Sequence, residues 1–135
     1  MSEAIAFPDV EALVVSKLRS ELASRDDVAH VSTRMLNPRT KRSVRVFRSG
    51  GRRRDLVVDT AQITIQCWDI TAPEASALSR LCRAVLSVNR GAWRHDGVQV
   101  YHYDEVGGPV FFPDPDTNLP RYQFTCSLDV RGEAI

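Results

Sequence analysis

The stretch Thr60-Ala-Gln-Ile-Thr-Ile-Gln-Cys-Trp68 decides the fold, because apolar and polar side chains alternate along its whole length. One face of the segment carries only apolar side chains: Ala61, Ile63, Ile65 and Cys67. The opposite face carries polar side chains of medium size and ends at Trp68. A period of two residues is typical of a β-strand that buries one face and leaves the other near water. The sequence therefore predicts a half-buried strand at residues 60–68.

A helix is predicted directly after this strand. Thr71 is its expected N-cap and Glu74 the reciprocal partner in a T-x-x-E capping box, while Pro73 is tolerated in the first turn. Apolar residues at spacings of three and four form the expected buried face: Ala75, Leu78, Leu81, Cys82, Val85 and Leu86. Gly91 is expected to stop the helix.

An earlier helix is predicted at residues 8–25. Its apolar stripe has the same spacing and consists of Val10, Leu13, Val14, Leu18 and Leu22. Pro8 suits the first turn, and Asp9 and Glu11 lie where the positive end of the helix dipole favours acidic side chains.

Alternating patterns predict four more strands, at residues 28–35, 43–48, 98–106 and 121–131. Asn37-Pro38 ends the first of them, and Ser49-Gly50-Gly51 is expected to turn the chain, so that a basic β-hairpin spans about residues 43–58. A long proline-rich loop is expected at residues 107–120. The order α-β-β-β-α-β-β predicts an α+β fold: one twisted, mainly antiparallel β-sheet with both helices packed on one face.

Length and composition indicate one folded domain over residues 1–135. The three cysteines, Cys67, Cys82 and Cys126, have no metal-ligand spacing and are expected to be reduced, buried side chains made in a reducing compartment. We expect no signal peptide, because Glu3 is acidic and no basic segment precedes it. No apolar run is long enough to span a membrane.

Charge is distributed unevenly along the chain. Nine basic residues and no acidic residue lie between positions 28 and 54: Arg34, Arg39, Lys41, Arg42, Arg45, Arg48, Arg52, Arg53 and Arg54. The whole chain has a net charge of +1, so the remainder is acidic. Such a molecule is able to attract polyanions through one part or to stack head to tail on copies of itself. The acidic remainder argues against a simple nucleic-acid binder, so assembly is the first expectation and DNA contact the second.

The sequence offers no catalytic or cofactor signature. The three histidines are scattered, and Asp114-Pro-Asp116-Thr-Asn118 only imitates the opening of a calcium loop, because Leu119 stands where the sharp turn needs glycine and Thr125 where the bidentate Glu belongs. Proline-stiffened turns with Asp side chains bonded to the backbone are the better interpretation. Nothing supplies a partner for Asp114 and Asp116 as a catalytic pair. We therefore expect no enzyme, no cofactor and no metal.

Candidate contact residues come from the basic hairpin and the long loop. Residues 52–54 either form a solvated hairpin tip or contact DNA phosphates or an acidic partner. Phe111 and Phe112 are either core plugs folded back under the sheet or anchors in a neighbouring subunit. The full set of subunit, partner or DNA contact candidates is Arg45, Arg48, Arg52, Arg53, Arg54, Phe111, Phe112, Asp114, Asp116 and Arg121, the last expected to pair with a neighbour's acid.

Several segments resemble one protein family. The run Ile63-Thr-Ile-Gln-Cys-Trp68, the run Thr71-Ala-Pro-Glu-Ala75 with the helix after it, and the closing runs Pro113-Asp-Pro-Asp116 and Leu119-Pro-Arg-Tyr122-Gln-Phe124-Thr are similar to tail terminator proteins of long-tailed siphophages, particularly those infecting actinobacteria. The leading helix fits the same plan.

The resemblance implies a small α+β subunit that closes into a ring, commonly a hexamer. The ring would cap the tail tube, stop its polymerisation and join the head-side connector, with genomic DNA passing through its lumen. The protein would then be a structural part of the virion tail or neck, assembled in the bacterial host cytoplasm without a membrane partner. The alternatives are a head-to-tail connector or stopper protein of the neck, or a small nucleic-acid-binding module that uses the basic segment 34–54.

Overall fold

The computed structural model describes residues 3–34 and 41–135. Its elements, in chain order, are β1 (Ile5–Ala6), α1 (Val10–Ala23), β2 (His30–Ser32), β3 (Ser43–Arg53), β4 (Val58–Trp68), α2 (Ala72–Leu86), the 3-10 helix η1 (Val88–Gly91), β5 (Trp93–His95), β6 (Val98–Phe111), β7 (Arg121–Arg131) and β8 (Glu133–Ala134). The end of the strand predicted at 28–35, the Asn37-Pro38 break and Arg39 lie outside the described residues. None of the helices described is long and apolar enough to cross a membrane.

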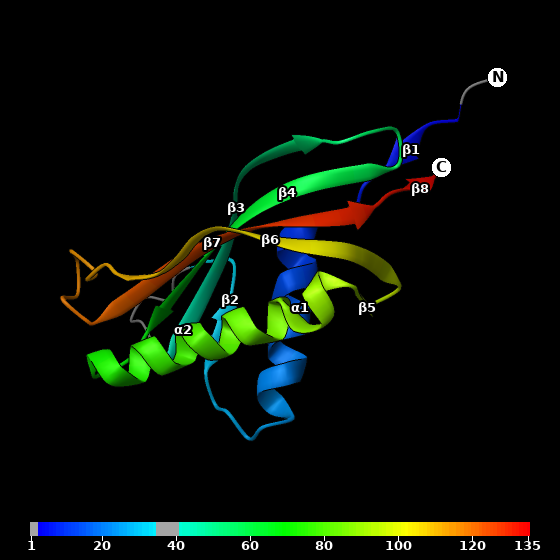
Figure 1. Cartoon of the computed structure of the whole chain (residues 1–135). Coiled ribbons are helices and arrows are strands. Elements are labelled where there is room, and N and C mark those ends of the chain that lie inside the picture. The colour runs from blue at the N-terminus through cyan, green and yellow to red at the C-terminus, as the bar shows by residue number, and fades with distance from the viewer. Residues whose placement is uncertain (1–2, 35–40) are drawn as a thin grey trace.

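One twisted sheet organises the molecule, with its strands in the order β2-β3-β4-β7-β6-β5 (Figure 1). Every neighbouring pair is antiparallel except β2 and β3, which run parallel. The short strands β1 and β8 pair with each other beside the main sheet. Both long helices lie on the same face of the sheet, below it in Figure 1. The predicted α+β class is confirmed, and the sheet is mixed because of the single parallel pair.

The core lies between this face and the two helices. The four apolar side chains predicted to share one face of β4 are all fully buried: Ala61, Ile63, Ile65 and Cys67. Phe124 and Leu128 continue the same layer on β7, and Leu18 and Leu78 meet it from the helices. Leu81 was expected on the buried face of α2 and is only partly buried. All three cysteines are buried and free, as predicted.

Local signals place the two helix starts. The Thr71 hydroxyl accepts a hydrogen bond from the backbone N–H of Glu74 at 3.3 Å, which confirms the predicted N-cap of α2. The Asp9 carboxylate accepts from the N–H of Ala12 at 3.1 Å and caps α1. Pro8 therefore precedes the cap, and its predicted place in the first turn is wrong. The chain leaves α2 after Leu86, before Gly91, which ends η1 instead.

Two strands are longer than the sequence predicts, because an antiparallel partner continues beside them. The expected turn at Ser49-Gly50-Gly51 is a register irregularity inside β3, and the real hairpin turn follows Arg53. Gly51 has φ +95°, and a Cβ there would lie 2.1 Å from the Thr60 carbonyl oxygen. Likewise β6 continues through Gly107 to Phe111, with three irregularities in its pairing with β7, so the loop expected at 107–120 is shortened to residues 112–120.

Gly91 and Gly97 provide a matched test of backbone packing. Both have positive φ, +88° and +76°, so alanine at either position should cost about 1–2 kcal/mol in unfolding free energy. A Cβ on Gly91 would also lie 2.2 Å from the backbone nitrogen of Tyr103, whereas a Cβ on Gly97 meets nothing within 4 Å. We expect Gly91→Ala to lose about 1–3 kcal/mol more than Gly97→Ala in urea unfolding. Equal losses would contradict the close approach of η1 to β6.

Candidate functional site

The basic segment does not form one continuous positive surface, because ion pairs to distant acids neutralise part of it. The Arg42 guanidinium lies 2.6 Å from an Asp27 carboxylate oxygen and 2.7 Å from one of Asp69. Arg48 pairs with Asp59 at 2.9 Å. The basic segment and the acidic remainder of the chain therefore neutralise each other in part within one subunit.

The double ion pair of Arg42 ties three connecting segments together. Its hydrogen bond to Asp27 lowers the pKa of that carboxyl group, against the opposing effect of burial. The same contacts raise the pKa of Arg42. Asp69 follows β4 and Asp27 follows α1, so this pair fixes the α1–β2 connection against the end of the central strand. The role of Arg42 is structural.

The basic hairpin residues divide between the two faces of the sheet. Arg45 lies on the face without helices, 4.5 Å from the Phe47 ring centroid, and donates to the Gln66 side chain at 3.4 Å. Arg48 is paired with Asp59 and keeps 35% of its side chain exposed, so the expected partner contacts of Arg45 and Arg48 stay predictions. At the end of the hairpin, Arg52 is exposed.

The last two hairpin arginines lie beside other elements of the same end of the molecule. The Arg53 guanidinium lies 4.9 Å from the Phe7 ring centroid, next to β1. Arg54 pairs with Asp129 of β7 at 2.7 Å but leaves 64% of its side chain exposed. Arg52, Arg53 and Arg54 are therefore accessible to a partner, as the sequence suggests for a hairpin tip.

The loop at residues 112–120 is anchored by a buried carboxylate. Asp114 is only 1% exposed and accepts a hydrogen bond from the Trp68 indole N–H at 2.8 Å. Its second oxygen accepts from the backbone N–H of Asp116 at 2.9 Å, and its carbonyl accepts from the N–H of Asn118. The Asp-Pro-Asp segment is thus a side-chain-stabilised turn. The hydrogen bond between Asp114 and Trp68 lies within the subunit, whereas the Asp116 side chain is exposed at the turn.

Arg121 holds the same loop from the other side. Its Nε donates to the Phe112 carbonyl at 2.9 Å, and its guanidinium lies 5.0 Å from the Phe112 ring centroid and 5.4 Å from that of Trp68. The residue is buried. Arg121 therefore supports the loop of its own subunit, and its expected pair with a neighbour's acid stays a prediction.

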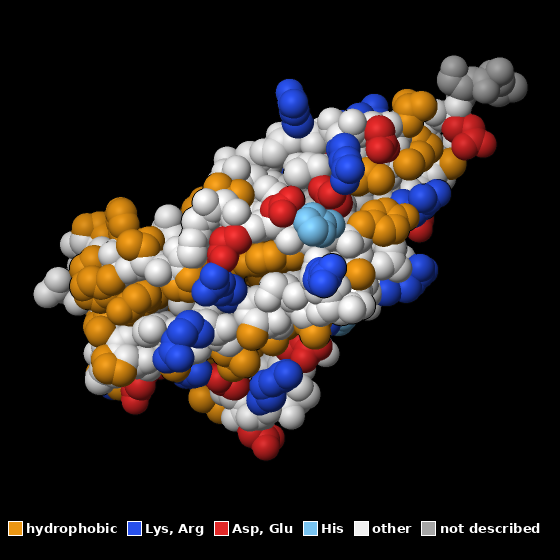
Figure 2. Space-filling model, in the orientation of Figure 1, with side chains coloured by type: hydrophobic (Ala, Val, Ile, Leu, Met, Phe, Trp, Pro, Cys, Tyr) orange, Lys and Arg blue, Asp and Glu red, His pale blue; other side chains and the backbone are white. Residues whose placement is uncertain are grey.

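These anchors present an apolar surface at one end of the molecule. Val110, Phe111 and Phe112 are 55%, 48% and 52% exposed, and we call these three residues the aromatic tip. Figure 2 shows hydrophobic side chains gathered at the end formed by the β6–β7 loop. Of the two interpretations left open by the sequence, the core plug is excluded. A half-exposed aromatic pair is typical of an association surface.

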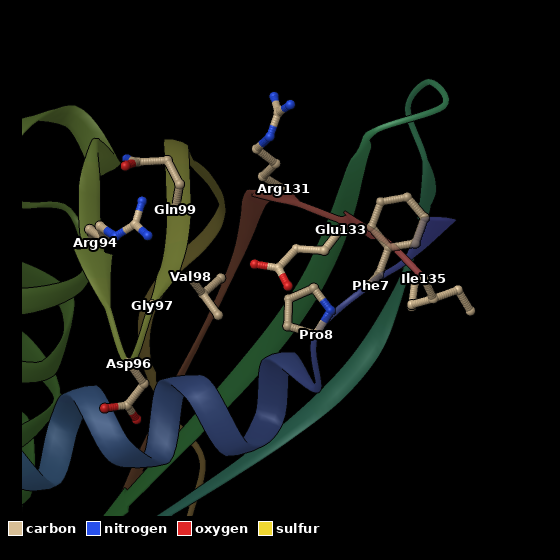
Figure 3. Close-up of a pocket in the computed structure, with 11 residues that line it drawn as sticks. Phe7, Pro8, Arg94, Asp96, Gly97, Val98, Gln99, Arg131, Glu133 and Ile135 are labelled. Atoms are coloured by element: carbon tan, nitrogen blue, oxygen red, sulfur yellow. The ribbon is translucent and has the colours of Figure 1, made fainter. Parts of the chain in front are cut away.

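A groove lies at the opposite end of the molecule, and sequence reasoning missed it (Figure 3). It has a volume of about 500 Å³ and is lined by Ala6, Phe7, Pro8, Arg94, Asp96, Gly97, Val98, Gln99, Arg131, Glu133 and Ile135. We call it the end groove. Phe7, Pro8 and Ile135 lie on one side and Arg94, Val98 and Gln99 on the other. The one local sequence feature that points to this groove is the dipeptide Asp96-Gly97. These two residues have φ values of +48° and +76° and form the tight turn between β5 and β6.

A small α+β subunit with an aromatic tip at one end and a groove at the other has the surfaces of a protein that assembles with other subunits. The sequence model of one family, the phage tail termination proteins, matches residues 6–134, and the chain belongs to that family. The resemblance noted in the sequence is thereby confirmed. The chain has a structural role in phage tail assembly. No curated protein matches the chain.

The Arg42 ion pairs predict a pH-dependent stability difference. We expect Arg42→Met to lower the unfolding free energy at pH 7 by about 2 kcal/mol, because two partly buried carboxylates lose their donor. Asp27 has a lowered pKa in the folded state, so its contribution is complete above its ordinary pKa near 4 and is lost as the pH falls further. The gap between variant and wild type should therefore narrow toward pH 2 in denaturant titrations.

Arg25→Met is the control, because Arg25 pairs with Glu21 across one helical turn with 48% of its side chain exposed. That variant should change stability by no more than about 0.5 kcal/mol. A gap for Arg42→Met that stays constant from pH 7 to pH 2 would show that the ion pairs do not carry the loss.

A double-mutant cycle tests the loop anchor. Asp114→Ala should cost about 1–3 kcal/mol, because it leaves the buried Trp68 indole N–H unsatisfied. In a Trp68→Phe background this part of the cost is already absent. We therefore expect a coupling energy of at least about 0.5 kcal/mol in urea unfolding, whereas strictly additive losses would contradict the hydrogen bond as the anchor.

Proposed function

We propose that copies of this chain close into a ring that caps the phage tail tube, stops its polymerisation and joins it to the head-side connector. Membership of the tail termination family supports this function. The observation that carries it is the difference between the two ends of the subunit: the aromatic tip at one end and the end groove with its arginines at the other. Unlike ends favour a head-to-tail contact, and such a contact forms a ring when its rotation closes.

The proposed mechanism is steric. A ring seated on the last layer of the tube occupies the surface that the next tube subunit would need, and its other side meets the connector. The family resemblance implies a hexamer, with genomic DNA passing through the lumen. The exposed arginines at residues 52–54 would face the tube protein, the connector or that DNA. The protein would be part of the virion tail or neck after assembly in the host cytoplasm.

Nucleic-acid binding as the main activity is less well supported. Phosphate contacts need accessible cations, and the affinity grows with their number. Arg42 and Arg48 are engaged in ion pairs, and Arg45 is partly buried on Phe47. Three of the nine basic side chains in this segment are thus committed to the fold of the subunit.

The test is electron microscopy of a lysate in which the gene carries a stop codon. We expect overlong tails without attached heads, because nothing ends tube growth, and tails of normal length when the intact gene is supplied on a plasmid. Tails of normal length that fail to join heads would instead assign the protein to the neck as a connector or stopper. Normal infectious particles would refute both functions.

A further inference from the structure

We propose that the irregular course of β6 guards an open edge of the sheet, so that further copies of the chain do not add to it strand by strand. β6 is an outer strand over most of its length, because β5 pairs with it only at residues 98–100. Beyond that point, no described strand runs beside residues 101–111 on the side away from β7. The inference concerns the subunit itself and does not depend on the capping function.

An unguarded edge at this place would promote aggregation. An edge strand presents a row of unpaired backbone N–H and C=O groups, and a long, flat and apolar one is a template for pairing with another chain. Three apolar side chains of this part of β6 are half exposed, Val106, Val110 and Phe111, at 56%, 55% and 48%. Every copy carries the same edge, so identical subunits are the partners that it would capture.

The pairing with β7 shows which backbone groups of β6 face outward. The Phe112 N–H donates to the Arg121 carbonyl at 2.7 Å, so Arg121 faces β6. Backbone groups alternate in direction along a strand, and β7 pairs with β4 without irregularity, so every second residue of β7 from Arg121 on faces β6. Phe111 and Glu105 lie opposite residues of β7 that face β4 instead. The N–H groups of Phe111 and Glu105 therefore point away from the sheet.

Three irregularities break the row of outward groups. Tyr101 and Val106 are each an extra residue relative to β7, and residues 108–109 together lie opposite Phe124 alone. An extra residue bends and twists its strand locally, so the outward groups do not lie in the straight line that a second strand needs. Pro109 also has no N–H to donate.

The 3-10 helix η1 covers the outer edge at Tyr103. A Cβ on Gly91 would lie 2.2 Å from the Tyr103 nitrogen, so the backbones of η1 and β6 are in contact there. Tyr103 lies opposite Leu128, which faces β4, so this nitrogen also points away from β7. η1 thus occupies the place that an added strand would take next to β5, and the irregularities interrupt the rest of the edge.

The other edge of the sheet is interrupted in a similar way. β2 covers only the first three residues of β3. Further along, the Arg48 N–H donates to the Glu11 carboxylate of α1 at 2.7 Å, and the pairing with β4 is irregular between Arg48 and Gly50. Interruptions at both edges favour association through side chains over a sheet that continues from one copy into the next.

A variant with a straightened β6 tests the guard. Deleting Val106 and Gly108 removes the extra residues on either side of Gly107, and Pro109→Thr restores the missing N–H. We expect this variant to form larger species in sedimentation experiments as its concentration rises, beyond any that the wild-type protein forms at the same concentration. Backbone amide exchange over residues 103–107, followed by mass spectrometry, should slow at least about tenfold in the associated form.

Two further variants serve as controls. Pro113→Thr makes the same proline substitution in the exposed loop after β6 and should leave sedimentation unchanged. Val110→Lys, added to the straightened variant, should restore wild-type sedimentation, because a charged side chain on an edge strand opposes pairing.

Unchanged sedimentation of a straightened variant that is folded by circular dichroism and urea unfolding would overturn the guard. Amide exchange over residues 103–107 of the wild-type protein that slows as concentration rises would overturn it as well, because strands would then already add to β6. This second measurement needs no substitution, so it decides the question even where the straightened variant does not fold.

Discussion

The burial of one face of β4 is the constraint on which the rest of the structure depends. β4 is flanked by β3 and β7, and its apolar face is fully enclosed. A slip of one residue would turn that face to solvent, so the alternation fixes the register of the central strands and requires both helices on the same side. The opposite face is closed by cross-strand hydrogen bonds, among them Gln66 to Gln123 at 2.9 Å and Thr64 to Thr125 at 3.1 Å.

The sequence predicts the elements whose signals are local. The alternation of β4 and the Thr71 cap of α2 need no information from elsewhere in the chain, and the buried apolar face and the cap were both found as predicted. The second face of β4 was expected near water, but Thr64, Gln66 and Trp68 on it are buried too. Where a strand ends depends on how far its neighbour continues beside it. The sequence predicted a turn at Gly50-Gly51, but β3 stays paired with β4 beyond these glycines, which form an irregularity within the strand. The same reason carries β6 through Gly107. The short strand β5 escaped prediction, although the Asp96-Gly97 turn after it is a recognisable hairpin signal.

The sequence identified candidate residues but not their contacts, because these contacts join residues that are far apart in the chain. The basic segment reads as one positive patch in the sequence, yet Arg48 and Arg54 meet acids that follow them in the chain by 11 and 75 positions. The exposure of Phe112 is decided by Arg121 and by the buried hydrogen bond of Asp114, neither of which a pattern in the loop reveals. The end groove combines β1, the β5–β6 turn and β8, so no single stretch of sequence could indicate it.

The internal ion pairs also bear on assembly. A subunit that displayed all nine basic charges of the segment would repel the same segment on its neighbours wherever these came close. Pairing with Asp27, Asp59 and Asp129 within the subunit offsets much of that repulsion, because each of these carboxylates lies next to an arginine of the segment.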